Sequence, residues 1–144
     1  MANYQKILVA IDLSEESAAV VQRARAIADG HSAELHLIHV IEPLSFAYGG
    51  DIPMDFSGIQ DEIHQQATAQ LNQFAENNQI DDSHRHILLG KPEVEIHASS
   101  EELGVDLIVV GSHGRHGLGL LMGSTANGVL HGAKVDVLAV RVGG

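Results

Sequence analysis

Five apolar runs recur along the chain, and each is bounded by polar or turn-forming residues. They cover residues 6–12, 33–43, 84–90, 105–111 and 135–142. The first run is continuous, which is typical of a strand that is covered on both faces of a sheet. Pro43 closes the second run, because proline cannot donate a backbone hydrogen bond to a continuing ladder. The pattern therefore predicts five β-strands.

Segments between these runs carry apolar residues at helical spacing. Residues 13–30 are predicted to form a helix with Ser14 as its N-cap and Gly30 as its stop. Further helices are predicted over residues 59–78, 92–104 and 124–133. Residues 44–58 have no clear period and are predicted to form a loop.

Strands and helices alternate along the whole sequence. This order predicts parallel strands joined by right-handed crossovers, with helices on both faces of one sheet. No internal repeat, linker or low-complexity segment divides the chain, so we expect residues 1–144 to form a single doubly wound α/β domain. In such sheets, ligands bind beyond the carboxyl ends of the strands, where the strand order reverses. The residues that follow the strands are therefore the candidates for a binding site.

Composition narrows the classes of partner. The 144 residues carry a net charge of −11 with only 8 Lys and Arg residues, which disfavours nucleic acid, because nucleic-acid affinity depends on clustered cations. The chain has no cysteine, which fits a reducing compartment. No apolar run approaches the roughly 20 residues that span a bilayer, and the first residues lack the features of a signal peptide. We therefore expect a cytoplasmic protein without membrane insertion.

Several well-known motifs are missing from the sequence. Gly90 and Lys91 are followed by Pro92 rather than by a hydroxyl residue, so there is no Walker A loop. The first strand-to-helix turn lacks the glycines of a dinucleotide fingerprint, and neither Ser112 nor Ser124 stands in a nucleophile elbow. The third strand is not followed by an aspartate, which disfavours a phospho-receiver domain.

The 10 histidines prompt a search for a metal site. His36 and His39 are three residues apart on one predicted strand, so their side chains point to opposite faces and cannot easily share an ion. His113 and His116 lie close together but have no evident third ligand, and zinc is not predicted there. Asp12 is predicted either to help hold a Mg²⁺ ion that bridges phosphates or to cap amides of the following helix.

The segment after the fourth strand, GSHGRHGLGLLMGST, is rich in glycine and hydroxyl residues. Gly111 and Gly114 permit close backbone approach, so that successive amides could converge on an anion. Gly123 precedes Ser124 and Thr125 at a predicted helix start, where free amides and hydroxyl donors favour phosphate oxygens. A surface loop would also use such glycines, but the position after a central strand favours a phosphate-binding segment.

This arrangement resembles the universal stress proteins, whose nucleotide-binding members carry Gly, two residues, Gly, nine residues and then Gly-Ser or Gly-Thr after the fourth strand. Gly111, Gly114, Gly123 and Ser124 follow that pattern here with a middle spacer of eight residues, one fewer. The resemblance runs from KILVAIDLSEES through LHLIHVIEP and DLIVVGSHG to VDVLAVRV. It implies a parallel sheet of strand order 3-2-1-4-5 and a homodimer in which the last strands of two subunits pair.

The resemblance also implies an ATP site. Asp12, one of whose two predicted roles is to hold Mg²⁺, would lie beside it. Ala10, Ile11 and Asp12 would border the adenine and ribose, and Val40 would meet the adenine through its backbone. The ribose and phosphates would be surrounded by Gly111, Gly114, Arg115, Gly123, Ser124 and Thr125. The implied function is a module whose binding or signalling depends on the nucleotide.

Two alternatives remain open at the level of sequence. A slow ATP hydrolase would need a group that orients water, and Asp12 or His113 could be nominated, although neither has an evident partner in the sequence. A nucleotide-free dimer that serves only protein interaction would be consistent with the shortened spacer.

Overall fold

The computed structural model describes residues 3–43, 57–112 and 124–142 of the chain. Its one five-stranded sheet has the order β3-β2-β1-β4-β5, and all neighbouring strands are parallel. The strands are β1 (Lys6–Ala10), β2 (Glu34–Ile41), β3 (Arg85–Leu89), β4 (Leu107–Gly111) and β5 (Asp136–Val140). The predicted α/β fold and the strand order 3-2-1-4-5 are therefore confirmed.

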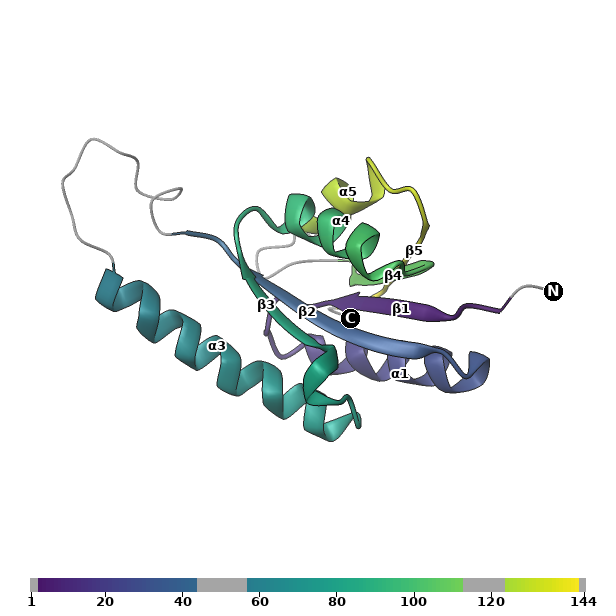
Figure 1. Ribbon diagram of the computed structural model, residues 1–144, viewed down its shortest axis with the longest axis horizontal. Coiled ribbons are helices and arrows are strands. Elements are labelled where there is room, and N and C mark those ends of the chain that lie inside the picture. The colour runs from purple at the N-terminus through teal and green to yellow at the C-terminus, as the bar shows by residue number, and fades with distance from the viewer. Residues whose placement is uncertain (1–2, 44–56, 113–123, 143–144) are drawn as a thin grey trace.

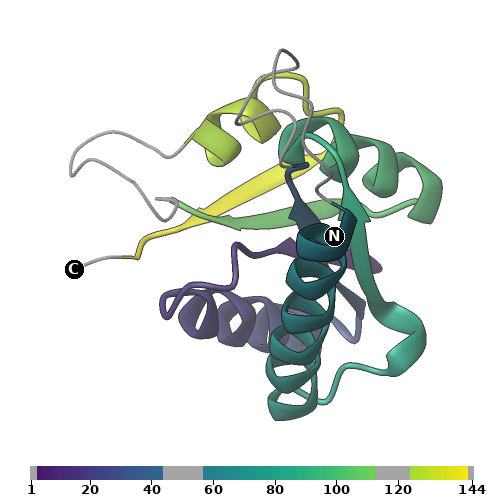
Figure 2. The same ribbon diagram turned by 90° about the vertical axis from the view of Figure 1, so that its left-hand side faces the viewer.

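Helices cover both faces of this sheet. In the described ranges they are α1 (Ser17–His31), α3 (Ser57–Asn77), the 3-10 helix η1 (Asp82–His84), α4 (Pro92–Leu103) and α5 (Ser124–Leu130). Helices α1 and α3 lie on one face, and α4 and α5 lie on the other (Figures 1 and 2). None of the described helices is long and apolar enough to cross a membrane.

Alternate side chains of each strand build a separate apolar layer on each face. In β1, Ile7 and Val9 belong to the layer under α1, whereas Leu8 and Ala10 belong to the layer that includes Ile96 of α4. Ile7, Leu8 and Val9 have 0% exposed surface, so β1 is buried on both faces. This double burial explains why the strand reads as a continuous apolar run.

The boundaries of α1 differ from those predicted. Its N-cap is Glu16, because the backbone N–H of Ser14 donates to the carboxylate of Asp12 at 3.0 Å and places Ser14 in the turn before the helix. At the other end the helix continues through Gly30 to a C-cap at Ser32, which has the left-handed φ of 54°. The assignments of Ser14 as N-cap and of Gly30 as stop are therefore wrong.

The strands and the last helix are shorter than the predicted segments. Each strand is two or three residues shorter than its predicted run, because the end residues enter the turns between elements. The last helix ends at Leu130 rather than at residue 133. Residues 44–56 of the predicted loop lie outside the described residues, and Gly58 already belongs to α3.

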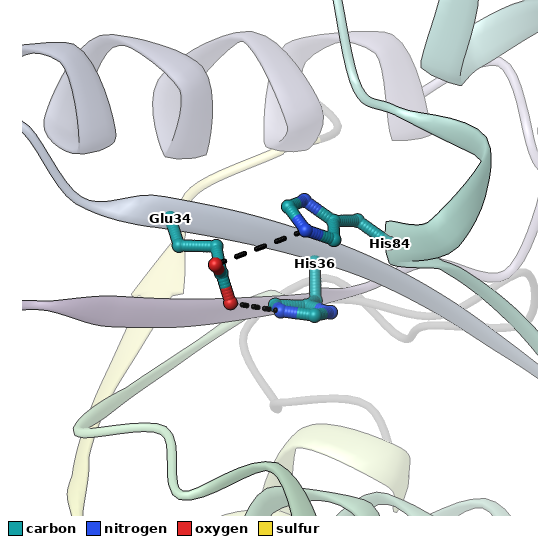
Figure 3. Close-up of side chains that lie close together, drawn as sticks. All are labelled: Glu34, His36 and His84. Carbon is teal, nitrogen blue, oxygen red and sulfur yellow. Dashed lines mark hydrogen bonds and ion pairs between the residues drawn. The ribbon is translucent and has the colours of Figure 1, made fainter.

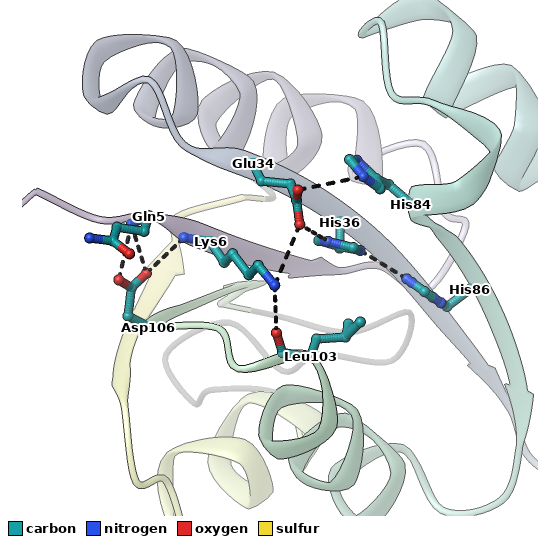
Figure 4. A network of polar contacts seen from close by, with 8 residues as sticks. All are labelled: Gln5, Lys6, Glu34, His36, His84, His86, Leu103 and Asp106. Carbon is teal, nitrogen blue, oxygen red and sulfur yellow. Dashed lines mark hydrogen bonds and ion pairs between the residues drawn. The ribbon is translucent and has the colours of Figure 1, made fainter.

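A network of polar contacts joins the amino ends of the central strands (Figure 4). Asp106 directly precedes β4, and its carboxylate accepts the backbone N–H of Gln5 at 3.0 Å and that of Lys6 at 3.1 Å. The backbone N–H of Asp106 donates in turn to the carbonyl of Lys6 at 2.9 Å. These hydrogen bonds hold the start of β4 against the start of β1.

We expect Asp106→Ala to lower the free energy of unfolding by about 1.5–3 kcal/mol, the usual worth of a hydrogen bond to a charged group. The matched control is Asp82→Ala, whose carboxylate makes an ion pair with Arg85 at 2.9 Å but is 94% exposed. Exposed pairs of this kind contribute at most about 1 kcal/mol. Urea denaturation measures both values, and equal losses in the two variants would contradict the role of Asp106.

Candidate functional site

A pocket opens at the carboxyl ends of β1, β2 and β4. Its volume is about 620 Å³, including the part that is open to solvent. Side chains from the end of β1 and the turn after it, from β2 and β4, and from the first turns of α1, α4 and α5 line it.

The order of the strands explains the position of the pocket. Strand β1 lies between β2 and β4, and the helices that follow β1 and β4 cover opposite faces of the sheet. The chain therefore diverges from the carboxyl ends of these two strands in opposite directions. A crevice remains between them, and this is the switch point at which doubly wound sheets bind ligands.

Most of the described residues that the sequence nominated meet in this pocket. Six of them line it, namely Ala10, Ile11, Asp12, Val40, Gly111 and Thr125. Ser124 begins α5 immediately before Thr125, and its side chain lies outside the described part of the chain. Gly114, Arg115 and Gly123 also lie outside the described residues. Residues from three strands and one helix are thus brought to one place.

The lining combines apolar surface with a few polar groups. Its larger aliphatic residues are Ile11, Val20, Ile38, Val40, Ile96, Val110 and Val142. Its polar side chains include the carboxylates of Asp12 and Glu16, and the described lining has no Lys or Arg. Apolar walls of this kind suit a flat ring, whereas the two carboxylates repel anions. The anionic part of a ligand would therefore lie away from Asp12 and Glu16.

Asp12 is held in place by the first turn that follows β1. Its Oδ1 accepts the backbone N–H of Ser14 at 3.0 Å and the hydroxyl of Ser17 at 3.1 Å. Leu13, which lies between Asp12 and Ser14, has a φ of 65°, a left-handed conformation that turns the chain sharply. Of the two roles predicted for Asp12, the contacts directly support hydrogen bonding to the start of α1.

A metal role for Asp12 stays a prediction. Within the described ranges, the one group of three or more potential metal ligands is Glu34, His36 and His84, which lies elsewhere in the sheet. Mg²⁺ often takes one or two carboxylates together with substrate phosphates, so a single Asp would be enough beside a nucleotide.

Sequence reasoning missed several residues of the pocket. His39 was considered only as a metal ligand, yet its Nδ1 lies 2.8 Å from the carbonyl oxygen of Ile11 and donates a hydrogen bond to it. Ser17 and Pro92 line the pocket from the first turns of α1 and α4. Ser17 and Pro92 could have been predicted, because helices that follow strands in a parallel sheet begin at the same edge at which ligands bind.

The fold and this pocket define the class of the protein. It is a doubly wound α/β protein whose pocket lies at the crevice between β1 and β4. The model of the universal stress protein family matches residues 3–141. The chain is also 43% identical over 148 residues to universal stress protein A homolog 2 of Coxiella burnetii, covering 100% of this chain and 99% of that protein. The chain belongs to the universal stress protein family.

Solved structures agree with this assignment. The hypothetical protein MJ0577 has a TM-score of 0.82 and 26% identity, with 97% of each chain covered. A universal stress protein in complex with cAMP has a TM-score of 0.70 and 24% identity, with 97% of this chain and 98% of that chain covered. The resemblance noted in the sequence is confirmed at the level of family and fold.

We expect Asp12→Ala to lower the free energy of unfolding by about 1–3 kcal/mol, because it leaves the hydroxyl of Ser17 without this acceptor in a buried position. Ser17 is only 2% exposed, so water cannot easily replace the lost partner. Asp12→Asn is the matched control, since its amide oxygen can still accept both hydrogen bonds and should preserve most of the stability. Urea denaturation that finds Asn as costly as Ala, or Ala without cost, would contradict this role.

Proposed function

We propose that this universal stress protein binds ATP in the pocket at the carboxyl ends of β1, β2 and β4, and acts as a nucleotide-dependent binding or signalling module. The observation that carries the proposal is the meeting of Ala10, Asp12, Val40 and Thr125 in one pocket at the carboxyl ends of the strands. The resemblance nominated these four residues for the same ligand from three separate parts of the sequence. The cAMP bound by a related protein is also an adenine nucleotide, which supports the same ligand class.

The described residues suggest how such a ligand would be held. Val40, Ile38 and Ile96 would offer apolar contact to the base, and Asp12 would lie near the ribose hydroxyls, which can donate to a carboxylate. The carboxylates of Asp12 and Glu16 would disfavour phosphates beside them, so the phosphates would extend toward Gly111 and Thr125. The glycine-rich residues predicted to surround phosphates follow Gly111 directly in sequence.

The proposal includes no catalytic step. Asp12, one of the two groups nominated to orient water, uses its Oδ1 to accept hydrogen bonds from Ser14 and Ser17. His113, the other, lies outside the described residues. No contact in the described part of the pocket favours hydrolysis over simple binding, and ATP with or without Mg²⁺ is proposed as a bound ligand rather than as a substrate.

We expect Thr125→Phe to weaken ATP binding at least about 100-fold, equivalent to about 2.7 kcal/mol, because the larger side chain would fill the pocket. Leu130→Phe is the matched control on the same helix, since Leu130 is exposed and does not line the pocket. Calorimetric titration with ATP and AMP measures the affinities, and ATP should bind more tightly than AMP.

Circular dichroism and the thermal midpoint of each variant keep this test interpretable. A folded Thr125→Phe variant that binds ATP as tightly as Leu130→Phe would contradict the assignment of the pocket. If titration finds no measurable affinity of the wild-type protein for ATP, the proposal is wrong, and a nucleotide-free interaction protein is favoured.

We also propose that two subunits pair through β5. This strand forms one edge of the sheet and pairs only with β4 in the described part of the chain, and unpaired edges are usually covered. Its Val137 and Leu138 are partly exposed, whereas Val140 is buried in the core. Leu138 is therefore a better test position than Val140, where a charge would damage the fold.

Leu138→Lys should shift the protein from dimer to monomer in sedimentation equilibrium, because two buried ammonium groups would be brought into the interface. Leu89→Lys provides the control at the opposite edge, since Leu89 ends β3 and is 51% exposed. It should leave the dimer unchanged. A dimer that survives Leu138→Lys but dissociates in Leu89→Lys would assign the interface to the other edge.

A further inference from the structure

Three potential metal ligands lie close together at the amino ends of β2 and β3, and none of them lines the nucleotide pocket (Figure 3). Glu34 and His36 are two residues apart on β2, so their side chains point to the same face. His84 ends η1, immediately before β3, which is the neighbour of β2 in the sheet. One ligand atom from each residue lies within 4.8 Å of the other two. We propose that Glu34, His36 and His84 bind Zn²⁺ or a chemically similar divalent transition cation.

The distances suit such an ion after small side-chain movements. Nε2 of His36 lies 2.7 Å from Oε2 of Glu34, and Nε2 of His84 lies 3.8 Å from Oε1 of Glu34. Zinc bonds to nitrogen and oxygen are about 2.0–2.2 Å long, so ligand atoms around a tetrahedral ion are about 3.3 Å apart. The two observed distances lie on either side of this value. Two imidazoles and one carboxylate form a ligand set that zinc uses, with the fourth position left for water.

The three side chains differ in exposure, so one ligand is fixed and the other two are open to an incoming cation. The side chain of His36 is 5% exposed, whereas those of His84 and Glu34 are 25% and 39% exposed. The ring of His36 is therefore held by its surroundings, while the other two side chains can adjust from the solvent side. A cation can reach the cluster without opening the core.

His86 is placed to orient the buried ligand. Its Nε2 lies 3.0 Å from Nδ1 of His36, the ring nitrogen that does not face Glu34 (Figure 4). When a metal ion occupies Nε2 of His36, the ring carries its proton on Nδ1 and can donate it to His86. Histidine ligands of metal ions commonly donate their second ring nitrogen to a neighbouring acceptor in this way. His86 is therefore a positioning residue rather than a ligand.

The ammonium group of Lys6 would compete with a bound cation for the carboxylate of Glu34. Its ammonium lies 3.8 Å from Oε2 of Glu34 and donates a hydrogen bond to the carbonyl of Leu103 at 3.1 Å. A network that serves only stability would use Lys6 to neutralise Glu34, and a bound cation would be repelled by it. The side chain of Lys6 is 42% exposed and can move aside. Lys6→Met, which keeps the apolar stem and removes the charge, should therefore tighten cation binding.

The direct test is calorimetric titration of Zn²⁺ alone into full-length protein that has been stripped of metal with a chelator and contains no nucleotide. We expect one saturable site for each chain. Glu34→Gln and His84→Ala should each weaken it at least about 10-fold, the lower limit for loss of even a hydrogen-bond partner of a ligand. Lys6→Met should bind several-fold more tightly than wild type. Excess Mg²⁺ should not displace Zn²⁺, because Mg²⁺ prefers oxygen ligands.

His64→Ala is the control, because His64 is an exposed histidine of α3 that lies outside the cluster. It should leave the Zn²⁺ affinity unchanged. Glu34→Gln is nearly isosteric at a partly exposed position, so it tests the site even if His84→Ala disturbs the fold. Absence of a saturable site in wild type, or unchanged Zn²⁺ affinity in folded Glu34→Gln, would overturn the proposal.

The proposed Zn²⁺ site does not depend on nucleotide binding. None of its three ligands lines the pocket, so His84→Ala should bind ATP as wild type does. Loss of Zn²⁺ affinity with ATP affinity retained is the expected pattern. Loss of both in a folded variant would contradict the separation of the two sites.

Discussion

The position of β1 between β2 and β4 is the constraint on which the rest of the structure depends. Its side chains alternate between two apolar layers and are buried on both faces, which requires helices on each side. Because α1 follows β1 on one face and α5 follows β4 on the other, the chain leaves a crevice at the carboxyl ends of these strands. The pocket is therefore a consequence of strand order, and only its lining depends on particular side chains.

The two ends of the sheet carry different chemistry. At the carboxyl ends, Asp12 is fixed by Ser14 and Ser17 beside apolar walls, an arrangement that suits a partly flat, partly polar ligand. At the amino ends, Asp106 joins β4 to β1, and the histidine cluster joins β2 to the start of β3. The hydrogen bond with His36 keeps the pKa of Glu34 below its ordinary value. His36 and Val40 lie four residues apart on β2, or roughly 13 Å.

Much of the fold could be predicted from sequence, because buried parallel strands leave continuous apolar runs that local inspection detects. The pocket could be predicted from the same runs, since the rule for doubly wound sheets placed Asp12, Val40 and Thr125 at one edge. Cap details were missed at Ser14, because its backbone N–H donates to the carboxylate of Asp12 and Ser14 lies in the turn before α1. The cluster of Glu34, His36 and His84 was missed because it depends on the register between β2 and β3, which no local pattern contains. The sequence contained only one sign of the cluster: Glu34 and His36, and likewise His84 and His86, are two residues apart, the spacing of side chains on one face of a strand.

The central claim is that a nucleotide lies at the carboxyl ends of β1, β2 and β4, and nuclear magnetic resonance tests it most directly. Backbone amide shifts would be followed in isotope-labelled wild-type protein while ATP is added. The account predicts saturable shifts at Asp12, Val40 and Thr125, with Glu34 and His84 unchanged. Saturable shifts confined to residues outside the pocket, or no shifts at a concentration of ATP far above the protein, would contradict it.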